Sequence, residues 1–310
     1  MEAVAIGALV DAGGIRLGHA SMNGTGVTVA VIDRGGVAGV DVRGSAPGTR
    51  ETDLLDPTAA VQQVNAIVLS GGSAFGLATA DGVMLELAEQ GQGLDTGMGI
   101  VPIVPAAVIF DLPVTGGTKP TQELGRQAVR NAGENRERGN VGAGTGAAVG
   151  KYLGIPGVMK GGLGQAAVRD GDLVVSAAVV VNALGDIYDS GVKIAGTHNE
   201  SGFLPTDSYV GASVGITNTT IGIVATNAAL TKAQATKVAS ASHDGLARSI
   251  RPVHTMDDGD TLFAVSTGDT AAHVNQVCYL AAEAVRLAVL DGVRSATSLP
   301  GIPAISDLPF

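Results

Sequence analysis

Short apolar segments alternate with longer segments of periodic apolar residues along most of the 310-residue chain. The short segments are rich in β-branched residues and end at Gly or Asp, which is typical of strands. We expect strands at residues 27–33, 39–42, 66–70, 173–181, 220–226 and 261–266. The longer segments repeat their apolar residues at helical spacing. We expect helices at residues 75–90, 120–131, 231–250 and 269–291.

The alternation of strands and helices indicates an α/β or α+β fold with strands buried on at least one face. Thr231 is a suitable N-cap for the third helix, and Gln234 completes a capping box. Two polar, Gly-rich segments, residues 133–150 and 202–213, are typical of loops. The tail, residues 295–310, has three prolines and no periodicity, so we expect it to wrap a neighbouring chain or to be disordered.

Composition narrows the functional classes. The 19 Lys and Arg residues against 29 Asp and Glu residues give a net charge of −10, which argues against nucleic-acid and anionic-membrane partners. No apolar run approaches the roughly 20 residues of a membrane-spanning helix, and no signal-peptide pattern opens the chain, so we expect a cytoplasmic protein. Charged residues make up only 15% of the chain, which favours an oligomer that buries surface.

The sequence also argues against common cofactor sites. A single cysteine, Cys278, excludes an intramolecular disulfide and a Cys-clustered metal site. The five histidines are scattered without a metal-binding pattern. The Gly-rich run at 142–151 ends in Gly-Lys, but Thr145 and Tyr152 stand where a phosphate-binding loop needs Gly and Ser or Thr. We therefore expect no metal and no organic cofactor.

Two short segments carry candidate chemistry. Residues 257–260, Asp-Asp-Gly-Asp, are the densest group of carboxylates, although alone they could be an acidic turn before a strand. Thr219 follows Asn218 at the start of an expected strand, and an internal Thr hydroxyl is a poor nucleophile. A cut before Thr219 would create an α-amine with a pKa near 7.7–8.0, able to act as general base for the adjacent hydroxyl.

Several motifs occur along the chain in a fixed order. GITNTTIGIVATNAALT (residues 215–231) and RPVHTMDDGDTLFAVSTG (251–268) are the two longest. They are accompanied by GVTVAVID (26–33), VDVRG (40–44), LSGGSAFGL (69–77), AVIFDL (107–112), VGAGTGAAVGK (141–151) and AAVVVNALGD (177–186). From about residue 14 to 290 the chain thereby resembles the nylon-oligomer (6-aminohexanoate oligomer) endohydrolases. It also resembles the related DmpA-type L-aminopeptidase/D-esterases and β-peptidyl aminopeptidases.

The resemblance implies a four-layer αββα sandwich of the N-terminal-nucleophile hydrolase type, shared with ornithine acetyltransferases. It implies a single domain, residues 1–310, made as a precursor that cuts itself between Asn218 and Thr219. The products would be an α chain, 1–218, and a β chain, 219–310, of 310 − 218 = 92 residues. The family also implies dimers or tetramers of such αβ units and catalysis without a cofactor.

The same resemblance implies roles for individual residues. Thr219 matches the nucleophile, and Asn182 matches the asparagine that stabilises the oxyanion. Lys151 matches the active-site lysine of the nylon-oligomer branch. Lys160 is the alternative, because it stands in a Lys-Gly-Gly run of the kind found in the aminopeptidase branch.

Three further positions bear on the substrate. Asp258 and Asp260 match the paired acidic residues of the nylon-oligomer branch, where the aminopeptidase branch has Ser and Glu. Phe110 departs from that branch, because the characterised nylon hydrolase has a Tyr there, near the active site. We expect an amide hydrolase that cleaves 6-aminohexanoate oligomers or small peptides. An aminopeptidase or β-peptidyl aminopeptidase, an acyltransferase of the ornithine acetyltransferase type, and a non-catalytic scaffold remain alternatives.

Overall fold

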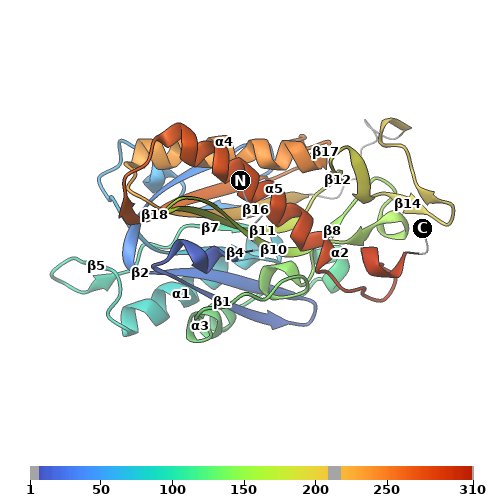
Figure 1. Ribbon diagram of the computed structural model, residues 1–310. Coiled ribbons are helices and arrows are strands. Elements are labelled where there is room, and N and C mark those ends of the chain that lie inside the picture. The colour runs from blue at the N-terminus through green and yellow to red at the C-terminus, as the bar shows by residue number, and fades with distance from the viewer. Residues whose placement is uncertain (1–6, 209–217, 309–310) are drawn as a thin grey trace.

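The computed structural model describes residues 7–208 and 218–308 (Figure 1). Its main strands form one hydrogen-bonded path in the order β10-β11-β16-β18-β2-β4-β7-β3, with β1 paired to β2. These strands are β1 (Ile15–Met22), β2 (Thr25–Val42), β3 (Thr49–Arg50), β4 (Val64–Ser70), β7 (Ala106–Val108), β10 (Gly162–Asp170), β11 (Leu173–Asn182), β16 (Thr219–Ala228) and β18 (Thr261–Thr270). The α-helices are α1 (Ala78–Glu89), α2 (Leu112–Thr115), α3 (Gln122–Arg130), α4 (Lys232–Ser249) and α5 (Val274–Arg294).

The long strand β2 connects two sheets. Its first half pairs with β1 and β4, and its second half pairs with β18 through residues 37–42. The register with β4 shifts between Val31 and Gly36, where the strand passes from one sheet to the other. One sheet therefore contains β1, β4, β7 and β3, the other contains β10, β11, β16 and β18, and β2 belongs to both.

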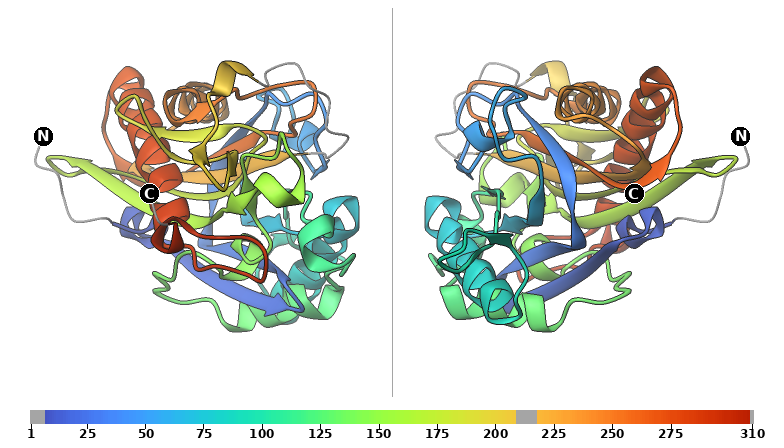
Figure 2. Two further views of the ribbon diagram at one scale, coloured as in Figure 1. Left: turned by 90° about the vertical axis from the view of Figure 1, so that its right-hand side faces the viewer. Right: turned by 90° about the vertical axis from the view of Figure 1, so that its left-hand side faces the viewer.

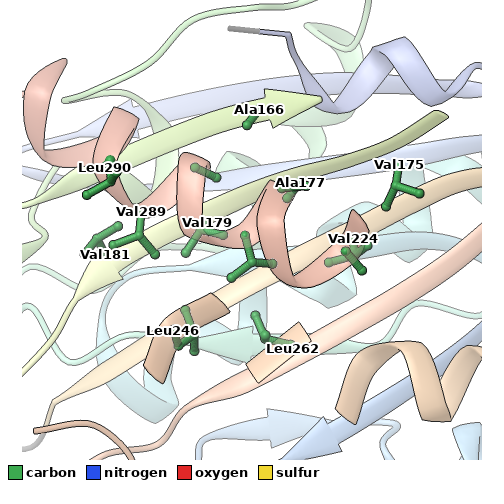
Figure 3. Close-up of a cluster of buried hydrophobic side chains, with 14 of the residues drawn as sticks. Ala166, Val175, Ala177, Val179, Val181, Val224, Leu246, Leu262, Val289 and Leu290 are labelled. Atoms are coloured by element: carbon green, nitrogen blue, oxygen red, sulfur yellow. The ribbon is translucent and has the colours of Figure 1, made fainter. Parts of the chain in front are cut away.

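The burial of alternate residues shows how the two sheets stack, because successive side chains of a strand point to opposite faces. In β11 the odd-numbered residues from Val175 to Val181 pack in one cluster with α4 and α5, as Figure 3 shows beside Val289. The even-numbered residues Ala178 and Val180 instead pack in the cluster between the two sheets. This side of the molecule thus has a helix layer over a sheet.

The opposite side repeats the arrangement. Val27, Val29 and Val31 of β2 pack in a third cluster with residues of α1 and α3, such as Val83 and Leu124. The layers therefore run helix, sheet, sheet, helix, with α4 and α5 on one outer face and α1 and α3 on the other (Figures 1 and 2). The expected αββα sandwich is confirmed.

Shorter strands outside the two main sheets form four small sheets, β13-β12-β17, β14-β15, β5-β6 and β8-β9. Their strands are β5 (Leu94–Asp95), β6 (Ile100–Val101), β8 (Ala148–Val149), β9 (Met159–Lys160), β12 (Asp186–Asp189), β13 (Val192–Ala195), β14 (His198–Asn199), β15 (Gly202–Phe203) and β17 (Ile250–Arg251). The 3₁₀ helices are η1 (Leu9–Ala12), η2 (Asp53–Leu55), η3 (Ser73–Leu77), η4 (Gly142–Gly144), η5 (Ile155–Gly157), η6 (Thr206–Ser208) and η7 (Ile305–Asp307). None of the helices in the described ranges is long and apolar enough to span a membrane.

Most of the expected elements are present. The capping box of α4 is confirmed, with Thr231 accepting from the Gln234 N–H and Gln234 reaching back to Thr231. The expected strands 27–33 and 39–42 are one strand, β2. The last helix begins at Val274, because β18 extends to Thr270 and occupies the first residues expected to be helical. Strands β1 and β10 were not expected.

The C-terminal tail packs on its own chain, contrary to the two outcomes expected for it. Ile302 and Ala304 are buried, and the Pro303 carbonyl accepts a hydrogen bond of 2.8 Å from the Lys160 N–H. Between residues 295 and 308 the tail is therefore held by the same segment that contains β9.

Candidate active site

Thr219 is the first residue of β16 and lies where three segments meet. In the sheet it is the register partner of Asn182, the last residue of β11. On the other side, β16 runs parallel to β18, and the loop before β18 carries Asp258 and Asp260. Asn218 forms an isolated parallel bridge with Asp258. The strand order thus brings residues from distant parts of the sequence to one end of the sheet.

The peptide bond between Asn218 and Thr219 is buried. The Thr219 hydroxyl donates a hydrogen bond to the carbonyl oxygen of Asn218. That oxygen also accepts from the Gly259 N–H at 2.8 Å, and the Asn218 N–H donates to the Asp257 carbonyl at 2.8 Å. Asn218 is 0% and Thr219 is 3% exposed. The carbonyl therefore lies between a side-chain hydroxyl and a backbone donor.

Lys151 contacts the side chain of Asn182. Its Nζ donates to Oδ1 of Asn182 at 2.8 Å and to the backbone oxygen of Asn182 at 3.0 Å. The amide nitrogen of Asn182 donates to the Phe110 carbonyl at 3.1 Å. Burial lowers the pKa of Lys151 to about 7, although the charges of Asp258 and Asp111 oppose this shift. The Gly-rich run thus brings to Asn182 an amine whose pKa is lowered by burial.

The two carboxylates have separate sets of partners. Asp260 accepts from the Thr220 N–H at 2.7 Å through one oxygen, and its other oxygen lies 2.8 Å from Nδ1 of His254. Asp258 accepts from the N–H and the hydroxyl of Thr255 at 2.8 and 2.6 Å. Burial, followed by the charge of Asp260, raises the pKa of Asp258 to about 6.

Lys160, the alternative active-site lysine, is fully buried. Burial lowers its pKa to about 7, as it does for Lys151. Its Nζ donates at 2.8–2.9 Å to three backbone carbonyls, those of Gly144, Ala147 and Gly161. Lys160 therefore stabilises the fold of the Gly-rich run, whereas Lys151 reaches the side chain of Asn182.

Phe110 and Lys151 line the same small pocket. Its other walls are mainly aliphatic and are formed by Pro113, Val114, Ala148, Gly154, Ile155 and Val158. Phe110 thereby lies beside the expected site, and its side chain adds an apolar surface there.

Three residues of the site were not singled out by sequence reasoning. Gly259 and His254 lie inside the motif that carries the two carboxylates, but nothing in their residue types announces a role. Asp111 directly follows Phe110 and is 1% exposed, and it accepts from the Thr25 hydroxyl at 2.6 Å. Burial raises the pKa of Asp111. The sequence signal that could have pointed to Asp111 is a charged residue directly after the apolar run 107–110.

No group of three or more His, Cys, Asp or Glu side chains in the described residues has the arrangement of a metal site. The side chains of Thr219, Lys151, Asn182, Asp258 and Asp260 supply a hydroxyl, an amine, an amide and two carboxylates. This set is suited to acyl transfer from an amide.

Two solved structures share the fold. A beta-aminopeptidase from Burkholderia sp. superposes with a TM-score of 0.74 at 20% identity, over 94% of this chain and 87% of that one. An L-aminopeptidase D-Ala-esterase/amidase from Ochrobactrum anthropi, described as a variant of the Ntn (N-terminal nucleophile) hydrolase fold, superposes with a TM-score of 0.73 at 18% identity. That match covers 97% of this chain and 91% of the other.

Sequence comparison identifies the family. The model of peptidase family S58 matches residues 7–304. An uncharacterized aminopeptidase of Mycobacterium tuberculosis (strain H37Rv) is 41% identical over 97% of both chains. The 6-aminohexanoate-oligomer endohydrolase of Paenarthrobacter ureafaciens is 32% identical over 84% of this chain and 74% of its own length. The resemblance is confirmed: the chain belongs to peptidase family S58 and is a hydrolase of amide or peptide bonds.

Proposed function

We propose that the chain cuts itself between Asn218 and Thr219 and that Thr219, as the new N-terminal residue, hydrolyses small linear amides. One observation carries this proposal. The Thr219 hydroxyl donates to the carbonyl oxygen of Asn218, so its oxygen lies beside the carbon it would attack. The cut would divide the single domain into residues 1–218 and 219–310.

The self-cleavage conserves atoms and charge. The Thr219 oxygen bonds to the Asn218 carbonyl carbon, and the peptide nitrogen leaves as an amine that takes up the hydroxyl proton. Water then hydrolyses the resulting ester: its oxygen and one hydrogen go to the Asn218 acyl group, and its other hydrogen restores the Thr219 hydroxyl beside a free α-amine. The new carboxyl group of Asn218 releases its proton to solvent and becomes a carboxylate. The α-amine acts as general base when Thr219 attacks a substrate.

The neighbouring groups support substrate hydrolysis. The side-chain amide of Asn182 stabilises the tetrahedral oxyanion, a contribution of roughly 2.7–4 kcal/mol for one such donor. Lys151 favours the neutral α-amine by like-charge repulsion. Asp258 and Asp260 hold the amine and the lysine in position. The nitrogen of Asn182 contacts the Phe110 carbonyl in the uncut chain, so it exchanges this partner for the substrate oxyanion.

The substrates we propose are short peptides with a free amino end or 6-aminohexanoate oligomers. The paired aspartates favour the oligomers, whereas Phe110 supplies an apolar surface in place of a hydroxyl. Hydrolysis of aminoacyl nitroanilides, β-aminoacyl nitroanilides and 6-aminohexanoate oligomers by one preparation distinguishes these classes. Acylation of an added amine in place of release of the free acid would identify an acyltransferase.

The test of the nucleophile is Thr219→Ala, followed by denaturing electrophoresis. We expect an uncleaved and inactive protein that still unfolds cooperatively, while Thr219→Ser still cuts. Thr226→Val is a matched control, because Thr226 is a buried threonine on the same strand whose hydroxyl donates to the Val174 carbonyl and accepts from the Ala228 N–H, with no bond to Asn218. Two bands from Thr219→Ala would exclude Thr219 as the cleaving residue.

We further propose that the cut protein is cytoplasmic and assembles as a dimer or tetramer of αβ units. The low content of charged residues, 15%, supports an assembly that buries surface. Light scattering on the cleaved protein measures the assembly, and cell fractionation tests the location.

A further inference from the structure

We propose that the backbone N–H of Gly259 stabilises the oxyanion that forms on Asn218 during self-cleavage. We further propose that a glycine is needed at position 259 to leave room for the Thr219 hydroxyl. This inference rests on the proposed self-cleavage and assigns its oxyanion donor to a group other than the Asn182 amide.

The hydrogen bonds around Asn218 carry the assignment. The carbonyl oxygen of Asn218 accepts from the Gly259 N–H at 2.8 Å, within the range of an oxyanion-hole donor. The amide nitrogen of Asn182 donates instead to the Phe110 carbonyl at 3.1 Å. In the uncut chain the scissile carbonyl is therefore polarised by Gly259 and not by Asn182.

The donor is held rigidly in place. The Asn218 N–H donates to the Asp257 carbonyl at 2.8 Å, so both backbone groups of Asn218 are bound to residues 257–259. This segment is itself fixed from behind, because the Asp258 carbonyl accepts from the Ala46 N–H at 2.9 Å. A donor already aligned on the carbonyl needs no reorganisation when charge develops there.

In the attack step the Thr219 oxygen bonds to the Asn218 carbonyl carbon. The electron pair of the carbonyl π bond moves onto the carbonyl oxygen, which becomes the oxyanion facing the Gly259 N–H. When the tetrahedral intermediate collapses, this pair re-forms the carbonyl and the Thr219 nitrogen leaves as an amine, protonated by the former hydroxyl proton. The Gly259 N–H itself gives up no proton.

The space around Gly259 explains the residue type. A Cβ at this position would lie 2.8 Å from Oγ1 of Thr219, 2.6 Å from the Ala46 carbonyl oxygen and 3.1 Å from Cα of Pro47. The contacts with Ala46 and Thr219 are both shorter than 3.0 Å, so an added Cβ forces a shift of the backbone between Ala46 and Gly259 and of the Thr219 hydroxyl. Any side chain at 259 therefore displaces the nucleophile from the Asn218 carbonyl.

The direct test replaces Gly259 by glycolic acid through nonsense suppression, which exchanges the N–H for an ester oxygen and adds no volume. We expect the fragment that ends at Asn218, identified by mass spectrometry, to form at least about 100-fold more slowly than in the unmodified protein. The same replacement at Gly71 is the matched control. Gly71 is also buried, and its N–H donates to the Gly26 carbonyl at 2.9 Å. If the protein with glycolic acid in place of Gly259 cut itself at the wild-type rate, the assignment would be overturned.

A second variant tests the steric part. Gly259→Ala should stay uncut, and hydroxylamine, which cleaves esters, should not release the fragment because the ester never forms. Gly133→Ala, at a glycine with no atom within 4 Å of the added Cβ, should cut normally. Rapid release by hydroxylamine in Gly259→Ala would place the defect after ester formation and overturn this part.

Thr219→Ala, run beside these variants, separates the two levels of the argument. Cleavage in Thr219→Ala defeats the proposed function itself. An uncut Thr219→Ala protein together with normal cleavage in both Gly259 variants defeats only the role of Gly259.

Discussion

Lys151 and Lys160 show that two residues with the same burial and the same pKa shift can have different roles. Burial lowers the pKa of each to about 7. Lys151 meets the side chain of Asn182, which borders Thr219 in the sheet, whereas Lys160 meets three carbonyls of the main chain. The proposed role of Lys151 in the reaction, and of Lys160 in the fold, rests on these partners and not on their titration.

Substituting each lysine by methionine separates these roles. Lys160→Met removes the ammonium donor from three buried carbonyls, of which those of Gly144 and Ala147 keep a backbone N–H donor. We therefore expect a loss of unfolding free energy of about 1–3 kcal/mol, the cost of an unsatisfied buried group. Lys151→Met should instead abolish amide hydrolysis with a smaller loss of stability. Urea unfolding and the nitroanilide assay measure both effects. A stable but inactive Lys160→Met protein would reverse the assignment.

The pKa of Asp258 leads to a prediction about pH. Burial and the charge of Asp260 raise this pKa from 3.8 to about 6, so the carboxylate forms only above about pH 6. We expect the rate of self-cleavage to rise through this pH. Asp260→Asn removes the repelling charge and should move the midpoint to lower pH, measured by electrophoresis of samples refolded across pH 4–8. An unmoved midpoint would show that another group sets it.

The same shift affects stability. Between pH 3.8 and 6 the folded protein retains a proton on Asp258 that the unfolded chain has lost. The contribution of Asp258 to the unfolding free energy therefore falls as pH rises through this window.

Side-chain chemistry was more visible in the sequence than backbone chemistry. Thr219, Asp258 and Asp260 stood out because their residue types and order match a family motif. The Gly259 N–H could not stand out, since every residue except proline has such a group and only the bridge between Asn218 and Asp258 aims this one. Which lysine reaches Asn182 likewise depends on the path of the Gly-rich run in space.

At the scale of elements, β10 shows why some strands escaped prediction. Its sequence, GLGQAAVRD, is rich in Gly and Ala and poor in the β-branched residues that mark strands. The structure explains this composition, because α5 crosses β10 closely. A Cβ on Gly164 would lie 1.9 Å from the Ala288 carbonyl oxygen. The close approach of α5 therefore limits the size of the residues on β10, and these small residues lack the β-branched pattern that predicts a strand.

This close crossing can be tested by adding one methyl group. Gly164→Ala forces α5 away from β10, and overpacking of this kind typically costs 1–3 kcal/mol of unfolding free energy, occasionally more. Gly133→Ala, which meets no atom within 4 Å, should leave the free energy nearly unchanged. Thermal and urea unfolding measure both variants. Equal unfolding free energies of the two variants would mean that α5 moves away from β10 without a measurable loss of stability.

At the scale of the whole molecule, the layer order was predictable from the family motifs, but the bending of β2 was not. The sequence shows two apolar runs separated by Arg34, Gly35 and Gly36, which suggests a turn between two strands. The chain instead continues as one strand that pairs with β4 and then with β18. This continuous path lets β2 pair with strands of both sheets.

The strand order predicts what happens to the two pieces after the proposed cut. β16 and β18 of the later piece lie between β11 and β2 of the earlier piece. We expect residues 1–218 and 219–310 to co-elute in native size-exclusion chromatography and to separate only in denaturant. Separation in native buffer would contradict the central position of β16.

The position of Thr219 at the meeting point of β11, β16 and the loop before β18 also has a consequence for synthesis in the cell. The groups around the bond come from residues 151, 182, 218–219 and 257–260, so a growing chain lacks some of them until residue 260 has been made. A ribosome-bound or misfolded copy keeps Thr219 inside a peptide bond and has no α-amine there. Under the proposed self-cleavage the uncut chain is an inactive precursor, and the active nucleophile forms only after the chain has folded.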